Sequence, residues 1–73
     1  MNKILVMGAA GQIGSELVPY LRKIYGNDNV VASDIKTEIP EILGGGPYEI
    51  IDGLDGKRIA EVIKKYKTDT VYN

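Results

Sequence analysis

Three glycines near the beginning of the chain have the spacing of a phosphate-binding turn. Gly8, Gly11 and Gly14 follow an apolar run at residues 3–7 and precede a stretch with helical periodicity. In such a turn the first glycine permits a tight reversal, the second lets the backbone approach a pyrophosphate, and the third lets the helix pack closely. The backbone N–H groups at the start of the helix then face the anion, those of Gln12 and Ile13 most directly.

We therefore predict that the turn binds the pyrophosphate of a dinucleotide. Its predicted binding residues are Gly8, Ala9, Ala10, Gly11, Gln12, Ile13 and Gly14. The alternative is a tight strand-to-helix connection in an α/β protein that binds nothing. A plain connection needs only one permissive glycine, so the spacing of three favours the binding interpretation.

An acidic residue follows at the distance this interpretation requires. Asp34 lies twenty residues after Gly14, at the end of the second apolar run. A carboxylate there accepts hydrogen bonds from the ribose hydroxyls of an adenosine and repels a 2′-phosphate. We predict NAD rather than NADP as the cofactor, with Ile35 and Lys36 beside the ribose, although the charge of Lys36 softens the rejection of a phosphate. The alternative role of Asp34 is a turn cap.

A second acidic position follows the third apolar run. Asp52, Gly53 and Leu54 would border the adenine, the carboxylate accepting from the exocyclic amine and Leu54 giving an apolar contact. The competing role is local, because Asp52 or Asp55 would also suit the cap of the helix that follows. For Asp55 we favour the cap.

Hydrophobic periodicity predicts the elements that position these residues. Apolar runs predict strands at residues 3–7, 29–33, 48–51 and 70–72. A helix is predicted from Gln12 to Tyr25, bent at Pro19, with an apolar face made of Ile13, Leu17, Leu21 and Ile24. A second helix carries Ile59, Val62, Ile63 and Tyr66, its lysines are predicted to be solvated, and residues 35–47 are predicted to be loop.

Strands that alternate with helices indicate parallel pairing with right-handed crossovers. We predict an α/β fold, a Rossmann-type doubly wound parallel sheet with strand order 3-2-1-4. Two helices are too few to cover both faces of such a sheet. Residues 1–73 are therefore expected to be the N-terminal half of a nucleotide-binding domain, in a chain that is incomplete.

Composition excludes several classes of chemistry. The 73 residues contain no cysteine and no histidine, which argues against disulfides, thiolate nucleophiles, zinc sites of the usual type and imidazole catalysis. No metal site and no catalytic residue is predicted. The 9 basic and 10 acidic residues are interspersed, so we expect no nucleic-acid partner. No apolar run suits a membrane span or a signal peptide, and a cytoplasmic location is expected.

The glycines together with Asp34 and Asp52 resemble the amino-terminal part of extended short-chain dehydrogenases/reductases of the epimerase/dehydratase branch. Within that branch, residues 11–17, Tyr25-Gly26, residues 29–35 and the Gly46-Pro47-Tyr48 step are similar to short-chain-type L-threonine 3-dehydrogenases. Met7 and Gly53 depart from the usual pattern, which has threonine and a branched apolar residue there. The departure at Gly53 weakens the expected adenine contact.

The resemblance implies an NAD-dependent enzyme that oxidises the amino acid L-threonine to 2-amino-3-ketobutyrate, acting as a homodimer. It also implies that a Ser or Thr and a Tyr-x-x-x-Lys pair perform the chemistry, and the chain has no such pair. The alternatives are a nucleotide-sugar epimerase or dehydratase, and a non-catalytic NAD-binding module. A Tyr-x-x-x-Lys pair outside these residues would distinguish the enzymes from the module.

Overall fold

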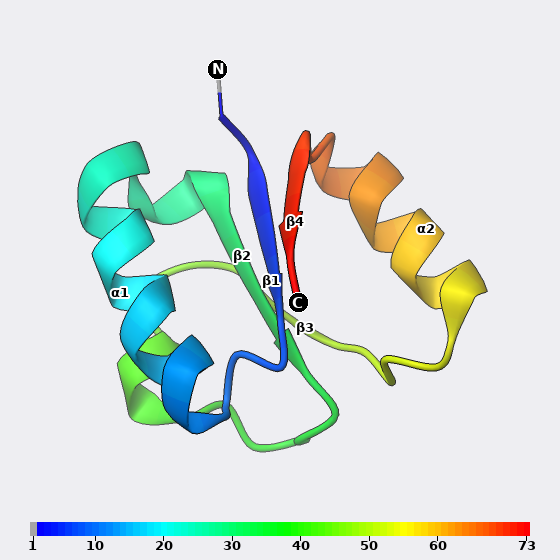
Figure 1. Cartoon of the computed structure of the whole chain (residues 1–73), viewed down its shortest axis with the longest axis horizontal. Coiled ribbons are helices and arrows are strands. Elements are labelled where there is room, and N and C mark those ends of the chain that lie inside the picture. Colours follow the sequence, from blue (N-terminus) through cyan, green and yellow to red (C-terminus); the bar gives the residue numbers. More distant parts are fainter. Residues whose placement is uncertain (1) are drawn as a thin grey trace.

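The computed structural model describes residues 2–73 and shows strands and helices in alternation (Figure 1). The strands are β1 (Ile4–Met7), β2 (Val30–Asp34), β3 (Tyr48–Ile50) and β4 (Thr70–Tyr72). The α-helices are α1 (Gln12–Tyr25) and α2 (Gly56–Tyr66), and two short 3₁₀ turns lie at Asn27–Asn29 and Glu41–Leu43. Every predicted element is present. The ends of each strand lie within one residue of the predicted ends.

The four strands form one parallel sheet in the order β3-β2-β1-β4. The register pairs Ile4 of β1 with Val30 on one side and with Thr70 on the other, and Ala32 with Tyr48. Because all strands run the same way, their carboxyl ends meet at one edge of the sheet. This confirms the predicted Rossmann-type order and places the ends of β1, β2 and β4 side by side.

Helix α1 covers one face of the sheet, and its buried side is displaced from the predicted one. Val18 and Leu21 pack against Ile4 and Val6 of β1, and Gly14 is also buried. The prediction that Ile13 and Ile24 belong to the buried face was wrong, since they are 80% and 54% exposed. The reason is that the helix touches the sheet along the line of Gly14, Val18 and Leu21, beside the predicted stripe.

Helix α2 covers the opposite face, as Figure 1 shows. Its predicted apolar residues are all in the second core cluster: Val62 is fully buried, and Ile59, Ile63 and Tyr66 pack around Leu5, Val31 and Ile51. The cap prediction is also confirmed, because the Asp55 side chain accepts a hydrogen bond from the N–H of Arg58 at 3.1 Å.

A buried arginine attaches the loop at residues 35–47 to α1. The Arg22 side chain is 5% exposed. Its guanidinium donates to the carbonyls of Val30, Leu43 and Pro47 at distances between 2.7 and 3.2 Å. Burial lowers the pKa of the Arg22 guanidinium, which stays charged at neutral pH. Arg22 therefore joins α1 to the loop at Leu43 and Pro47 and to the start of β2 at Val30.

Replacing Arg22 by methionine is expected to destabilise the fold by about 3 kcal/mol, because the buried hydrogen bonds of the guanidinium to three carbonyls are lost while the aliphatic stem is roughly preserved. Urea denaturation measures this difference. Lys23→Met, which changes the exposed neighbour on the same helix, is the matched control and should shift the unfolding free energy by no more than about 0.5 kcal/mol. Equal effects of the two substitutions would contradict the assignment.

A carboxylate on β3 joins that strand to α2. Glu49 has an 11% exposed side chain and accepts hydrogen bonds from Arg58 at 2.8 Å, Lys65 at 3.0 Å and the hydroxyl of Tyr66. Burial alone would raise the pKa of Glu49, but these three donors outweigh it and lower the pKa from 4.5 to about 2. Lys65, predicted to be solvated, thus has a partner, although its side chain stays 61% exposed.

The lowered pKa of Glu49 makes part of the stability pH-dependent. The contribution of Glu49 to the free energy of unfolding is complete above pH 4.5 and is lost as the pH falls towards 2. Over this range the carboxylate takes up a proton in the unfolded chain before it does so in the folded one. Glu49→Gln should cost about 2 kcal/mol at pH 7 and progressively less below pH 4.5. Thermal unfolding over this pH range measures it, and a difference from the native protein that stays constant with pH would contradict the prediction.

Candidate dinucleotide-binding site

The turn after β1 begins with a backbone conformation that favours glycine. Gly8 has a φ of +71°, in the left-handed region that side chains disfavour. The turn is closed by a hydrogen bond from the N–H of Gly11 to the carbonyl of Gly8 at 3.0 Å. The N–H of Ala9 donates to the carbonyl of Ser33 at 2.9 Å, which anchors the turn to the neighbouring strand β2.

Gly14 lets α1 approach this turn more closely than any other residue would. A Cβ at this position would lie 2.6 Å from the carbonyl oxygen of Gly8 and 2.7 Å from the Cα of Ala9. Both are backbone atoms that cannot swing aside. The prediction that Gly14 allows close packing of the helix is thus supported. The close contact is with the backbone of the glycine turn.

The first turn of α1 presents unpaired backbone donors. Its N-cap, Gly11, has no side chain and makes no capping hydrogen bond. The first helical hydrogen bond runs from the N–H of Ser15 to the carbonyl of Gly11, so the N–H groups of Gln12, Ile13 and Gly14 have no partner within the helix. Donors of this kind, together with the positive end of the helix dipole, bind anions.

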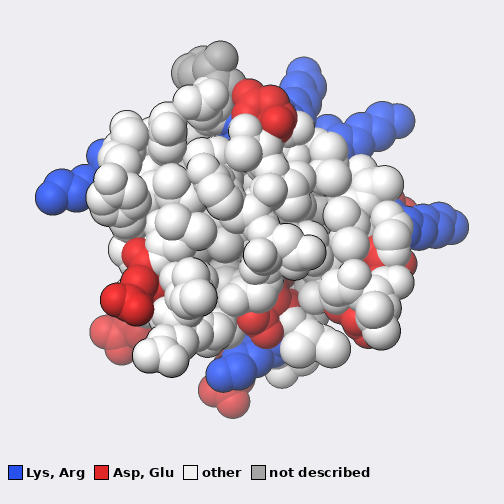
Figure 2. Space-filling view, in the orientation of Figure 1, with Lys and Arg blue, Asp and Glu red and all other residues white. Residues whose placement is uncertain are grey.

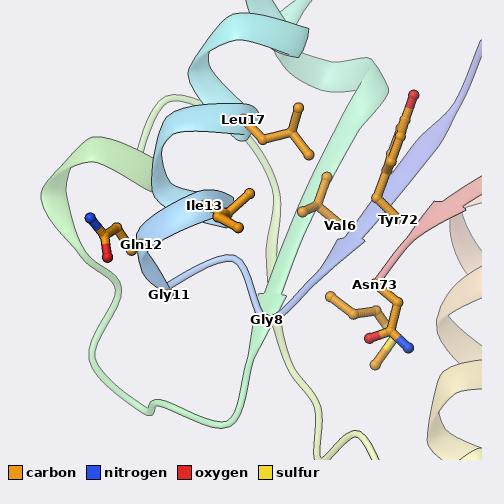
Figure 3. A pocket seen from close by; sticks show the side chains of 10 residues that line it. Val6, Gly8, Gly11, Gln12, Ile13, Leu17, Tyr72 and Asn73 are labelled. Carbon is orange, nitrogen blue, oxygen red and sulfur yellow. The ribbon is translucent and has the colours of Figure 1, made fainter.

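A cavity of about 620 Å³ lies beside these donors (Figure 3). It is lined by Val6, Met7, Gly8, Gly11, Gln12, Ile13, Gly14, Leu17, Tyr72 and Asn73. Leu17 and Ile13 from α1 and Tyr72 from β4 lie on opposite sides of it, with Val6 between them. The walls are therefore mostly apolar, and the polar groups come from the backbone of the glycine turn and from Gln12, Tyr72 and Asn73.

Charged side chains do not gather at the centre of the face that carries α1 and β4. In Figure 2 they lie around its margin, and the middle is uncharged. An anion bound there would depend on backbone N–H groups and the helix end, in place of lysine or arginine side chains.

The Asp34 carboxylate connects the two predicted halves of the site. Its Oδ2 accepts from the N–H of Ala10 in the glycine turn at 3.0 Å, and its Oδ1 accepts from the N–H of Lys36 at 3.2 Å. The acid after β2 is thus held against the glycine turn after β1. This is the spatial neighbourhood that the spacing of Gly14 and Asp34 predicted.

A second cavity, of about 270 Å³, opens next to Asp34. It is lined by Met7, Gly8, Asp34, Ile35, Ile51, Gly53 and Asn73. Gly8, Met7 and Asn73 belong to both cavities, so the two lie next to each other along the carboxyl edge of the sheet.

Five of the predicted binding residues do not line these cavities: Ala9, Ala10, Lys36, Asp52 and Leu54. Ala9 is fully buried in the core, and the N–H of Ala10 donates to Asp34. Both residues therefore contribute to the shape of the turn and do not face the cavities. Asp52 accepts from the N–H of Leu54 at 2.9 Å in a local turn, whereas the helix cap named as its alternative role is provided by Asp55. Leu54 is 95% exposed. The adenine contact of Asp52 and Leu54 stays a prediction.

Six lining residues were not among the predicted binding residues: Val6, Met7, Leu17, Ile51, Tyr72 and Asn73. Met7 ends β1, and Tyr72 and Asn73 lie at the end of β4. The strand order predicts that β4 ends beside β1, and that order was the signal from which their position could have been inferred. Tyr48 was also missed. Its hydroxyl donates to the carbonyl of Lys36 at 2.9 Å.

The described residues, 2–73, contain no cluster of three or more potential metal-binding side chains. Within the same range, neither α-helix has the length and hydropathy of a membrane span.

The sequence from residue 4 to residue 73 matches the model of the NAD-dependent epimerase/dehydratase family. The chain belongs to this family. The glycine turn at the end of β1 and the acid at the end of β2 are its candidate NAD-binding groups.

Known proteins match nearly the whole of this chain. An uncharacterized epimerase/dehydratase of Staphylococcus saprophyticus is 49% identical over 72 residues, which are 97% of this chain and 22% of the relative. The L-threonine dehydrogenase of Clostridium difficile is 46% identical with a TM-score of 0.89, over 97% of this chain and 23% of that one. A UDP-glucose 4-epimerase of Brucella ovis, solved with NAD, is 32% identical with a TM-score of 0.74, over 97% and 22%. The chain thus spans about a fifth of the length of its relatives.

The residues present fit the ADP half of NAD. The unpaired N–H groups of α1 suit the pyrophosphate, and the absence of Cβ atoms at Gly8 and Gly11 leaves its approach open. Asp34, at the next strand end, suits the ribose hydroxyls.

Substituting Gly14 by alanine should destabilise the protein by about 2–4 kcal/mol and weaken NAD binding, because the new Cβ pushes the first turn of α1 off Gly8 and Ala9. The matched control is Gly56→Ala, also in the first turn of a helix, where a Cβ meets no atom within 4 Å. That variant should be neutral or stabilised by up to about 1 kcal/mol. Calorimetric unfolding and NAD titration distinguish them, and a tolerated Gly14→Ala would refute the close-packing role.

Proposed function

We propose that this chain is the ADP-binding portion of an NAD-dependent oxidoreductase that acts on L-threonine. The observation that carries the NAD assignment is the Asp34 carboxylate held at 3.0 Å from the N–H of Ala10, beside the unpaired N–H groups of α1. This arrangement brings a ribose-binding acid and a pyrophosphate-binding turn to one edge of the sheet. The 46% identity to the L-threonine dehydrogenase of Clostridium difficile supports the choice of substrate.

In this proposal each part of the chain has one task. The N–H groups of Gln12 and Ile13 bind the pyrophosphate, and Gly8 and Gly11 keep its approach free of side chains. Asp34 accepts from the ribose hydroxyls and disfavours a 2′-phosphate by charge. Bound NAD supplies the hydride acceptor for oxidation of the 3-hydroxyl of threonine, giving 2-amino-3-ketobutyrate and NADH. The groups that move the substrate proton lie outside these residues.

A second candidate is a nucleotide-sugar epimerase, supported by the 32% identity to the UDP-glucose 4-epimerase solved with NAD. Such an enzyme returns the hydride to its substrate, so it releases no net NADH. The two candidates share the cofactor site of this chain and differ in the fate of the hydride. Formation of NADH with L-threonine is therefore the deciding measurement.

In the full-length protein that contains this chain, L-threonine and NAD should give NADH, followed by its absorbance, and UDP-glucose should give neither NADH nor UDP-galactose. Asp34→Ala should raise the KM for NAD by a factor of about 10–100, the effect of losing hydrogen bonds to a charged group. Asp28→Ala, at an exposed aspartate beyond the far end of α1, is the control and should leave the KM unchanged.

NADH release with threonine that is insensitive to Asp34→Ala would overturn the assigned cofactor site. Epimerisation of UDP-glucose without NADH release would overturn the threonine assignment. NAD binding with neither activity would support the non-catalytic module.

A further inference from the structure

Four hydrogen bonds hold the turn at Asp34–Lys36, where β2 ends. Its carboxylate, on Asp34, accepts from the N–H of Ala10 and from the N–H of Lys36. The main chain is fixed again where the carbonyl of Asp34 accepts from the N–H of Ile51 at 2.9 Å. The fourth contact comes from a side chain: the hydroxyl of Tyr48 donates to the carbonyl of Lys36 at 2.9 Å.

Tyr48 is itself rigidly placed. Its half-buried ring packs against the core cluster under α1, and it begins β3 opposite Ala32. The preceding residue, Pro47, is fixed through its carbonyl, which accepts from the N–H of Ala32 at 3.0 Å and from Arg22 at 2.9 Å. Because ring and backbone are both constrained, the hydroxyl can hold the Lys36 carbonyl at a defined distance from Asp34.

The hydroxyl remains a donor at neutral pH. Burial, and then the charge of Asp34, raise the pKa of Tyr48 above its ordinary value of 10.0. The effect of Asp34 also indicates that the hydroxyl lies within the electrostatic range of the ribose-binding carboxylate.

We propose that Tyr48 is a positioning residue for cofactor selectivity, which favours a free 2′-hydroxyl over a 2′-phosphate by holding the Lys36 carbonyl and with it the closed turn at Asp34–Lys36. This proposal rests on the proposed function, because it requires that the site binds NAD. With the turn closed, the Lys36 main chain faces Asp34 and Tyr48, and the carboxylate stays at the ribose position.

Loss of the hydroxyl would release the Lys36 carbonyl and let the turn open. Asp34 would then lose the restraint from the Lys36 N–H, and the Lys36 ammonium, on an exposed side chain, would be free to approach a phosphate. Both changes reduce the discrimination against NADP. Neither alters the glycine turn, so binding of the pyrophosphate itself is retained.

The test is the ratio of the dissociation constants for NADP and NAD, measured by calorimetric titration on the full-length protein that contains this chain. Tyr48→Phe should lower this ratio about 5-fold, the effect of one ordinary hydrogen bond. Tyr66→Phe is the matched control, since it removes a hydroxyl from a half-buried tyrosine on the opposite face of the sheet. It should leave the ratio unchanged even if it lowers stability.

Two further variants separate positioning from folding. Tyr48→Phe combined with Lys36→Ala should lose the gain in NADP affinity, because the ammonium supplies it. Lys36→Ala alone keeps the carbonyl acceptor and should retain or increase the preference for NAD, so a loss of preference there overturns the proposal even if Tyr48→Phe does not fold.

An unchanged ratio in Tyr48→Phe, in a protein that binds NAD, overturns the positioning role and leaves the proposed function intact. A native protein that binds neither NAD nor NADP overturns both.

Discussion

The close approach of α1 to the turn after β1 is the constraint on which the rest of the structure depends. A missing Cβ at Gly14 allows the helix to lie on the backbone of Gly8 and Ala9. At that distance Val18 and Leu21 reach the sheet, and the first N–H groups of the helix come to the carboxyl edge. Core packing and anion binding therefore have the same geometric origin, and a change that lifts the helix disturbs both.

The loop between β2 and β3 is held mainly by polar contacts. Among residues 35–47, only Leu43 has a fully buried apolar side chain. Three consecutive glycines in this loop contribute no side chains to the core. Arg22 compensates by donating to the carbonyls of Leu43 and Pro47, and to that of Val30 at the start of β2. Helix α1 thus positions the proposed pyrophosphate donors at its first turn and, through Arg22, its eleventh residue, the loop on the proposed adenosine side, so the two halves of the candidate site keep their relative places.

Sequence periodicity was sufficient to predict the secondary-structure elements and their order. Buried parallel strands and an amphipathic helix such as α2 each have a direct hydrophobic pattern. The face of α1 was misassigned because Gly14 contributes no hydrophobicity, although it marks the line of closest contact. The position of Asp34 beside the glycine turn followed from strand adjacency.

Periodicity could not predict the hydrogen-bonding roles of Arg22, Glu49 and Tyr48. A charged residue on a helix normally faces solvent, and an acidic residue in a short edge strand has no distinctive spacing. Their partners are backbone carbonyls or side chains brought together only by folding: Arg22 reaches residues 8 to 25 positions away, and Glu49 reaches Tyr66 across β3 and α2. Local pattern carries no information about such long-range hydrogen bonds.

The hydrogen bonds of Asp34 are compatible with its proposed role in binding, because a carboxylate has about four acceptor positions on two oxygens. Two are used by the N–H groups of Ala10 and Lys36, one on each oxygen. The remaining acceptor positions are left for the ribose hydroxyls, and Asp34 lines the cavity of about 270 Å³. An asparagine amide would offer a single acceptor oxygen and, with its NH₂ group, a second donor facing an N–H. A carboxylate can therefore accept from both N–H groups and from a ribose at the same time, whereas a neutral amide of the same shape loses one of the two N–H hydrogen bonds.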